Sequence, residues 1–282
     1  MSLEQLSWEA LRFPLTGMRP AAPVVPATAE RVRERAKHVV VKPETMNYRT
    51  MMPEVGGMFD PKLFGPGTVI DGPVIDPDAP VKPRKTWFGR IPLAVPIVHP
   101  LFVEHVRPQL GERLGVDAAA ISDAAQSLAR GREIVALLAA HADLAPLVMT
   151  ELPMLPPELR PLHRTEDDRW MTSGLNLWYQ RVINRSRQLA RSLEIPETDP
   201  VVLDSQFANL HETIRRLFEN DESSDAELDA DGRALPSLRT LCGGTLALYR
   251  ALRETHPVDG PQPGRCHVAR LAMFALGFDV SG

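Results

Sequence analysis

The stretch that decides the fold runs from Thr172 to Asn220 and reads TSGLNLWYQRVINRSRQLARSLEIPETDPVVLDSQFANLHETIRRLFEN. Its second half repeats apolar residues at alternating steps of four and three, the spacing of a coiled-coil seam, at Leu203, Phe207, Leu210, Ile214 and Leu217. Its first half keeps the same rhythm, interrupted by Arg185, at Leu175, Trp178, Val182, Leu189 and Leu193. The pattern predicts two long amphipathic helices folded back on each other, and we call residues 172–220 the hairpin.

Local signals mark the ends of both helices. Thr172 or Ser173 is expected to cap the first helix. Residues 196–200, Pro-Glu-Thr-Asp-Pro, are expected to form the turn, because proline lacks a backbone donor and disfavours a helical conformation in the preceding residue. The first helix would be roughly 34 Å long at about 1.5 Å per residue. We therefore expect the hairpin to project from the body of the protein as a surface that another molecule binds.

Composition sets limits on the function. The chain has 282 residues, of which 44% are hydrophobic, enough to bury a core and typical of about two domains. The net charge of -4 and the isoelectric point near 6.1 exclude a generally basic protein that binds nucleic acid by bulk charge. The 27 prolines, concentrated before Pro108 and between Pro146 and Pro161, indicate an extended, loop-rich N-terminal half.

Signals for metals, disulfides, secretion and membranes are missing from the sequence. Cys242 and Cys266 form neither a CxxC pair nor a four-ligand set, so we expect no structural zinc, no disulfide scaffold and no cofactor. No apolar run reaches the roughly 18 residues of a membrane span. Glu4 and Glu9 stand where a signal peptide carries positive charge, so a cytoplasmic protein is expected.

The rest of the chain predicts an α+β fold that is mainly helical, with an irregular, proline-rich N-terminal region containing short strands. The expected elements are helices at 3–13 and 28–37, the latter capped by Thr28; a surface loop at 67–86; a strand at 90–100, confined to a sheet edge by its prolines; helices within 101–145, ended by Pro146; a polyproline-like connector at 152–162; an acidic solvated loop at 219–231; and a helix at 246–254. The projecting hairpin completes this fold.

Several segments resemble, in the same order, the N-terminal clamp region of the β′ subunit of bacterial DNA-directed RNA polymerase. They are residues 42–45 (KPET), 47–50 (NYRT), 53–66 (PEVGGMFDPKLFGP), 89–99 (GRIPLAVPIVH), 155–162 (LPPELRPL) and 172–185 (TSGLNLWYQRVINR). They are similar to the family's zipper segment, the strand after it, the connector before the lid, and the start of the paired clamp helices. One short motif would be weak evidence, but an ordered series over roughly residues 39–241 is far more specific.

The resemblance implies a division of the chain into five parts. These are an N-terminal arm (1–38), a zipper- and clamp-like region (39–102), a helical region with a lid-like connector (103–171), the clamp-helix hairpin (172–220), and an acidic loop followed by a helical tail (221–282). Each boundary follows a motif of the family or a change in composition.

Three departures from the family limit what the resemblance implies. Residues 67–88 contain no cysteine, so the family's zinc ribbon is not expected. The loop after the clamp helices is basic in the polymerase, but here residues 219–231 carry seven carboxylates and no cation before Arg233, so phosphates would repel it. No Asn-Ala-Asp-Phe-Asp-Gly-Asp motif occurs, and phosphoryl transfer needs such carboxylates to hold two metal ions. We therefore expect no catalytic residue and no polymerase activity from this chain by itself.

The hairpin carries the main candidate site. In the polymerase the clamp helices are the main docking site for σ factor, and Arg185 matches a σ-contacting arginine. An arginine in an apolar seam is costly to bury, so it is expected to reach solvent or to wait for a carboxylate partner. The candidate partner-binding residues are Arg181, Arg185, Arg187, Gln188, Arg191 and Gln206. Gln206 stands where the family has an acidic residue, which favours a changed partner specificity; alternatively, these side chains are simply solvated.

A weaker candidate site matches the zipper loop, which approaches upstream promoter DNA in the polymerase. Its residues are Lys42, Tyr48 and Arg49, an aromatic and two cations that suit contacts to sugar and phosphate. So few cations would engage DNA only within a larger complex, and the alternative is that this segment merely shapes the loop. The histidines share no metal-ligand spacing, so each is expected to be a surface or packed histidine. Cys242 has no partnered His and Asp, so it is expected to be a small buried thiol.

Together these observations predict a non-catalytic transcription protein that resembles the β′ clamp. Its expected partner is σ factor or another clamp-binding transcription protein, bound through the hairpin, with no membrane contact. Two alternatives stay open: a structural piece of a split DNA-directed RNA polymerase that joins the polymerase core, and a DNA-binding module acting through Lys42, Tyr48 and Arg49. The acidic loop makes the last of these the least favoured.

Overall fold

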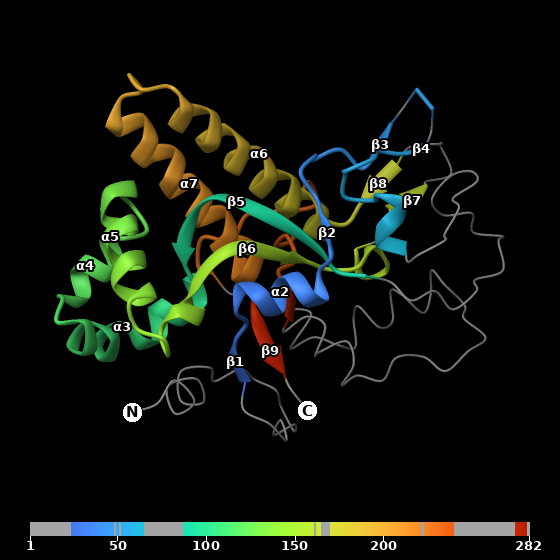
Figure 1. Ribbon diagram of the computed structural model, residues 1–282. Helices are drawn as coiled ribbons and strands as arrows, with labels where there is room; N and C mark the ends of the chain where they lie inside the picture. The colour runs from blue at the N-terminus through green and yellow to red at the C-terminus, as the bar shows by residue number, and fades with distance from the viewer. Residues whose placement is uncertain are drawn as a thin grey trace.

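The computed structural model describes residues 24–47, 49–50, 52–64, 87–160, 162–164, 170–220, 223–239 and 274–280 (Figure 1). The expected helices at 3–13 and 246–254 and the expected loop at 67–86 lie outside these residues. Within them the fold is mixed and mainly helical, which confirms the predicted fold class. None of the helices in this part of the chain is long and apolar enough to cross a membrane.

Short strands alternate with helices along the chain. In order, the elements are β1 (Val24–Pro26), α2 (Ala29–Arg35), β2 (His38–Val39), β3 (Met46–Asn47), β4 (Met52–Pro53), the 3-10 turn η1 (Pro61–Phe64), β5 (Gly89–Val98), α3 (Pro100–Leu114), α4 (Ala118–Asp123), α5 (Leu128–Ala139), η2 (Ala145–Leu147), β6 (Val148–Met154), η3 (Pro157–Leu159), β7 (Leu162–Arg164), β8 (Trp170–Thr172), α6 (Gly174–Glu194), α7 (Pro200–Glu219) and β9 (Phe278–Val280). Thr28 caps α2 as predicted, because its hydroxyl accepts a hydrogen bond from the Arg31 amide.

A long antiparallel pair, β5 and β6, runs through the middle of the molecule (Figure 1). β2 pairs in parallel with the other side of β5, so the strand order is β2-β5-β6 and β5 is the central strand. The prediction that prolines confine the strand at 90–100 to a sheet edge is therefore wrong.

Two features let β5 carry its prolines in a central position. β2 is so short that it pairs only with Gly89 and Arg90, and the β5–β6 register breaks between Pro92 and Ile97. Where the register breaks, Ser186 of α6 hydrogen-bonds the backbone of β5. Its hydroxyl accepts from the Ala94 amide at 2.9 Å and donates to the Pro92 carbonyl at 3.2 Å. The Ser186 hydroxyl thus supplies hydrogen bonds to the backbone of β5 where the pairing with β6 is interrupted.

The connector predicted at 152–162 is more regular than its composition suggests. Leu152 and Met154 are buried in β6, where Leu152 pairs with Ile91 of β5. Only after Met154 does the chain leave the sheet, first through η3 and then into β7, which pairs with β8. Pairing with β5 and burial override the proline-rich composition, so the prediction of a polyproline-like conformation is wrong for the first part of the segment.

Helices cover the two sides of the β5–β6 pair. The helices predicted within 101–145 are present as α3, α4 and α5, which gather at one end of the pair (Figure 1). The last of them, α5, ends at Ala139 rather than at Pro146, which lies in η2. α2 packs against β6, and α6 packs against β5. The small pairs β3–β4 and β7–β8 lie at the opposite end of the molecule from α3–α5 (Figure 1).

The two helices predicted for the hairpin are α6 and α7. Ser173 caps α6, Asp199 caps α7, and the predicted turn lies between them. The two helices contact each other, and the apolar positions of the predicted seam are buried along most of its length, at Leu175, Trp178, Val182, Leu189, Phe207, Leu210, Ile214 and Leu217. The hydrophobic spacing therefore predicted both helices and their buried faces.

The hairpin projects less than its length suggests. α6 packs against β5, and α7 packs against α3 and α5, so most of the hairpin belongs to the body of the protein. Residues 190–203, which we call the tip, include no buried residue and extend past the neighbouring helices (Figure 1). The prediction that the hairpin projects from the body is therefore wrong for most of the hairpin, which packs against the rest of the protein.

Arg160 joins the base of the hairpin to the N-terminal region. Its side chain is 0% exposed. Nε donates to Leu155 O at 2.8 Å, Nη1 to Asn176 Oδ1 at 2.9 Å, and Nη2 to Met58 O at 2.6 Å. The guanidinium also lies 4.9 Å from the centre of the Phe59 ring. A buried charge is tolerated only when its donors are satisfied, so this side chain fixes three distant segments relative to one another.

A buried histidine holds the last described segment, residues 274–280, against the body. His99 Nε2 donates to Leu276 O at 2.7 Å, and its ring packs against those of Phe218 and Phe278, with centroid distances of 5.5 and 4.9 Å. Gly277, with φ of 84°, permits this approach, because a Cβ there would lie 3.0 Å from His99 Nε2. Burial lowers the pKa of His99 to about 4, so the ring is neutral at physiological pH.

Replacing Arg160 with methionine should lower the free energy of unfolding by about 3 kcal/mol or more, because three buried oxygens lose their donor. Urea unfolding followed by circular dichroism measures the change. The matched control is Arg132→Met on the exposed face of α5, which should change stability by less than about 0.5 kcal/mol. Equal unfolding midpoints for the two variants would contradict this account of Arg160.

Acid should destabilise the fold through the buried His99 and the half-buried His211. Burial lowers the pKa of both His99 and His211 to about 4, whereas an unfolded histidine titrates near about 6.5. Between these values the unfolded state binds more protons, so the free energy of unfolding should be fully retained above pH ~6.5 and decline as pH falls toward ~4. His99→Gln, which can still donate to Leu276 O, should flatten the decline in urea unfolding measured across this range. The control His141→Gln, at an exposed position, should not flatten the decline. Identical slopes of unfolding free energy against pH in the unchanged protein and both variants would refute the prediction.

Candidate functional site

Four of the predicted partner-binding residues form a row along α6. Arg181, Arg185, Gln188 and Arg191 follow one another at steps of four, three and three, so they lie on one face of the helix from its base to its tip. We call these four residues the α6 row. Arg187 also belongs to α6 and, four residues before Arg191, lies beside the outer end of the row. The members of the row are in three different environments.

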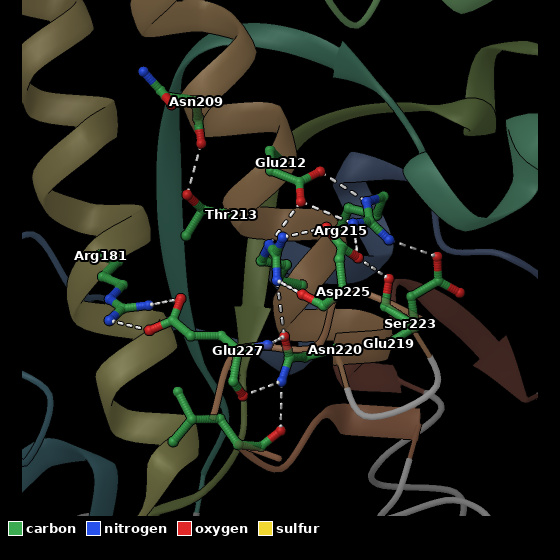
Figure 2. Close-up of polar contacts among 12 residues, drawn as sticks. Arg181, Asn209, Glu212, Thr213, Arg215, Glu219, Asn220, Ser223, Asp225 and Glu227 are labelled. Atoms are coloured by element: carbon green, nitrogen blue, oxygen red, sulfur yellow. Dashed lines mark hydrogen bonds and ion pairs between the residues drawn. The ribbon is translucent and has the colours of Figure 1, made fainter. Parts of the chain in front are cut away.

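Arg181, at the base of the row, is bound by the acidic loop (Figure 2). Its Nη1 and Nη2 donate to the two carboxylate oxygens of Glu227 at 2.7 and 2.6 Å, which is a bidentate ion pair. The guanidinium also lies 4.8 Å from the centre of the Trp178 ring. The hydrogen bonds from Arg181 lower the pKa of Glu227, which keeps this carboxylate charged at neutral pH. Arg181 is therefore occupied within the chain.

Arg185, the residue that interrupts the seam, bridges the two helices. Its Nη1 donates to Asn209 O at 2.8 Å and also to Thr213 Oγ1, both on α7. Thr213 Oγ1 in turn donates to Asn209 O at 2.6 Å (Figure 2). Burial, and then the nearby charge of Arg181, lower the pKa of Arg185. Neutral oxygens of α7 thus bind this arginine. We expected Arg185 either to reach solvent or to wait for a carboxylate partner, and the structure shows neither.

The outer part of the row has no partner within the described residues. Gln188 and Arg191 are exposed, as is Arg187 beside them, and none of the three forms a hydrogen bond or ion pair with another residue of the described ranges. Gln206 on α7 is half-buried, and its Oε1 is buried without a hydrogen-bond partner in the same part of the chain. The predicted residues that are open to a partner are therefore Arg187, Gln188 and Arg191.

The acidic loop is folded onto the base of the hairpin, which corrects the prediction that residues 219–231 are simply solvated. Asn220 is fully buried, and its side chain binds the backbone of the loop (Figure 2). Its Nδ2 donates to Glu227 O and to Leu235 O, each at 3.0 Å, and its Oδ1 accepts from the Glu227 amide at 2.9 Å. We call residues 223–233 the acidic segment.

Arginines of α7 complete the polar network at the base. Arg216 pairs with Asp225 of the acidic segment at 2.6 Å and with Glu212 at 2.7 Å. Arg215 pairs with Glu212 at 2.7 Å (Figure 2). A hydrogen bond from Ser223, and then the charge of Arg216, lower the pKa of Asp225. Two carboxylates of the acidic segment, Glu227 and Asp225, thus pair with cations of α6 and α7 respectively.

The tip exposes large aliphatic side chains. Ile195 is 59% exposed, Val201 72% and Val202 44%. Glu194 and Glu197 are exposed next to them. Aliphatic side chains gathered at the free end of a supported element are typical of an interaction site. The tip is therefore the second part of the candidate surface, and it shares Arg191 with the α6 row.

The segment DSQFAN, residues 204–209, attaches α7 to α5. Asp204 Oδ1 accepts from the Leu128 amide at 2.8 Å, at the N-terminus of α5, where backbone amides lack partners within the helix. Phe207 approaches Gly131 of α5 so closely that a Cβ there would lie 2.7 Å from Phe207 Cζ. Residues that depart from the family pattern therefore have a structural role, which motif comparison alone did not detect.

The weaker candidate site is only partly available. Lys42 is paired with Glu54 at 2.5 Å, and the Arg49 amide donates to Asn47 Oδ1 at 3.1 Å. Tyr48 lies outside the described residues. In the described ranges, no three or more His, Cys, Asp or Glu side chains are grouped so that they could hold a metal ion.

The chain has relatives among curated proteins. It is 27% identical over 315 aligned positions to the DNA-directed RNA polymerase subunit β′ of Methylibium petroleiphilum and to that of Leptothrix cholodnii, with 79% of this chain and 22% of each relative covered. It is 25% identical over 311 positions to the β′ subunit of Protochlamydia amoebophila, with 77% of this chain and 22% of the relative covered. No protein-family model matches the chain.

These alignments cover most of this chain but a small part of each relative. The chain therefore spans 22% of the length of the curated relatives it matches. The three relatives have the same name, which is the subunit that the ordered motifs at 42–66, 89–99, 155–162 and 172–185 resemble. The chain is a homologue of one region of the β′ subunit of DNA-directed RNA polymerase.

Proposed function

We propose that this chain is a transcription protein that binds σ factor, or another clamp-binding transcription protein, through the outer part of its hairpin. The observation that carries the proposal is an uncovered tip on a fixed base: residues 190–203 include no buried residue, whereas α6 and α7 below them pack on β5, α3 and α5. The similarity of the chain to β′ and the resemblance of residues 172–185 to the clamp helices support the choice of partner.

The rigid base favours binding because the surface is ordered before a partner arrives. Arg160 and Asn176 fix the start of α6, and Asp204 fixes the start of α7 against α5. Side chains presented from such a support lose less conformational freedom on binding than side chains on a loose loop. The hairpin is thus suited to act as a docking element.

The chemistry of the surface suits a partner helix that combines acidic and apolar side chains. Arg187 and Arg191 supply exposed positive charge, and Gln188 supplies both a donor and an acceptor. The aliphatic cluster of Ile195, Val201 and Val202 supplies the apolar contact that interface centres need. Charge complementarity would set orientation and specificity, and burial of the cluster would supply most of the affinity.

The proposal includes no polymerase activity for this chain. Phosphoryl transfer by this family requires the metal-binding Asn-Ala-Asp-Phe-Asp-Gly-Asp motif, which the sequence does not contain. Binding without catalysis fits either a competitor that removes σ factor from polymerase or an adaptor that recruits it.

A second candidate function is a structural piece of a split RNA polymerase. A different observation favours it: Val39, Val41 and Val55 are 43%, 45% and 66% exposed, in the region that resembles the zipper of β′. An aliphatic patch of this kind is typical of a surface covered by another subunit. Co-purification with polymerase core at equal stoichiometry would favour this function, and binding to σ factor in the absence of core would favour the first.

Reversing the charge of Arg191 should weaken binding to the principal σ factor of the source cell by roughly three- to tenfold, because an exposed cation on the docking face becomes an anion. Val201→Asp should weaken binding at least as much, since it places a charge in the apolar cluster. Titration of the purified chain against labelled σ factor, followed by fluorescence anisotropy, measures both variants.

The matched control is Arg132→Glu, the same charge change at an exposed position of α5. It should leave the affinity within about twofold of the unchanged protein, as expected for a surface charge away from the interface. No binding of the unchanged protein, or equal affinities for all variants, would count against the proposed surface.

A further inference from the structure

The α6 row is divided between two residues that face solvent and two that the chain itself binds, Arg185 through neutral oxygens of α7 and Arg181 through a carboxylate. Gln188 and Arg191 are exposed, whereas both outer nitrogens of Arg181 are bound by the carboxylate of Glu227. The contact joins residues 46 positions apart, so it depends on how the acidic segment folds back after Asn220. Among the row's members in the described ranges, Arg181 alone is held by an anion.

The ion pair is weak enough to exchange. Its side chains are 31% and 38% exposed, so water competes for both. Exposed ion pairs shift an equilibrium by about fivefold or less, and the bidentate geometry places this pair toward the upper end of that range. The backbone of the acidic segment is held separately, by two hydrogen bonds between Glu227 and the fully buried Asn220, which also donates to Leu235 O just after the segment. The Glu227 carboxylate can therefore leave Arg181 while the segment stays in place.

We infer that the acidic segment is a built-in competitor for the docking surface, in which Glu227 covers Arg181 until an acidic side chain of the partner displaces it. The inference rests on the proposed function, since it concerns the same surface. Displacement lengthens the cationic surface from Arg191 toward the base of α6. A partner that lacks an acidic side chain at this position meets the shorter surface, so the segment adds selectivity for acidic partners.

The charges around Arg181 support this role. Arg181 lies near Arg185, and the repulsion between them is part of what lowers the pKa of Arg185, while Glu227 acts in the opposite direction. Removing the Glu227 carboxylate would leave Arg181 without its anion and Arg185 with only Glu212 to offset the repulsion. An incoming carboxylate would therefore be attracted to the place that Glu227 vacates.

Glu227→Gln tests directly whether Glu227 covers Arg181, with Asp231→Asn as the matched control. Both changes remove one negative charge from the acidic segment, but Asp231 is exposed and has no ion pair with a described residue. Phenylglyoxal modifies accessible arginines, and mass spectrometry reads the modification of Arg181 in the full chain. Modification should be about two- to fivefold faster in Glu227→Gln than in the unchanged protein, and unchanged in Asp231→Asn. Equal rates at Arg181 in all three proteins would overturn the inference.

Titration of the same proteins against the principal σ factor tests the competition. Glu227→Gln should bind about two- to fivefold more tightly than the unchanged protein, and Asp231→Asn should not. Faster modification of Arg181 with no gain in affinity for a σ factor that does bind would overturn the role as a competitor. If σ factor binds none of the proteins, the proposed function fails, while the modification rates still decide whether Glu227 covers Arg181.

Discussion

The buried guanidinium of Arg160 is the constraint on which the position of the hairpin depends. It hydrogen-bonds Met58 in the N-terminal region, Leu155 after β6 and Asn176 in the first turn of α6. A charge buried this deeply has no alternative partner in water, so its acceptors must stay where they are. The start of α6 is fixed as a result, and a helix fixed at one end presents its other end in a defined direction.

That constraint separates the hairpin into a structural base and an exposed tip. At the base, charges are balanced within the chain: Arg181 by Glu227, Arg216 by Asp225 and Glu212. Toward the tip, Arg191 and the aliphatic side chains of Ile195 and Val201 are left to solvent. The boundary between the two parts falls near Arg185, which is held by neutral oxygens of α7. A surface available for binding thus begins where internal pairing ends.

The fold was predicted best where local chemistry leaves few alternatives. Apolar residues at coiled-coil spacing predicted α6 and α7, and Thr28 and Ser173 are caps because their hydroxyls meet free backbone amides. Pro92 misled the prediction for β5, because a short neighbour and Ser186 remove the need for the hydrogen bonds that proline cannot make.

The candidate site could be predicted only in part, for a related reason. The α6 row follows from helical spacing, but the partners of its members come from distant segments. No local pattern encodes the meeting of Arg181 with Glu227 or of Asp204 with Leu128, since each depends on the path of the chain between them. The one available signal was complementary charge, an arginine-rich hairpin followed by seven carboxylates in residues 219–231.

Similarity to one region of β′ and a hairpin with a free tip lead to the same central claim, that the tip docks another transcription protein. Hydrogen exchange of the full chain, measured by mass spectrometry with and without saturating σ factor, tests that claim most directly. The account predicts slower amide exchange in residues 187–203, with residues 128–139 of α5 unchanged. Unchanged exchange in residues 187–203, or protection confined to the region around Val41 and Val55, would contradict it.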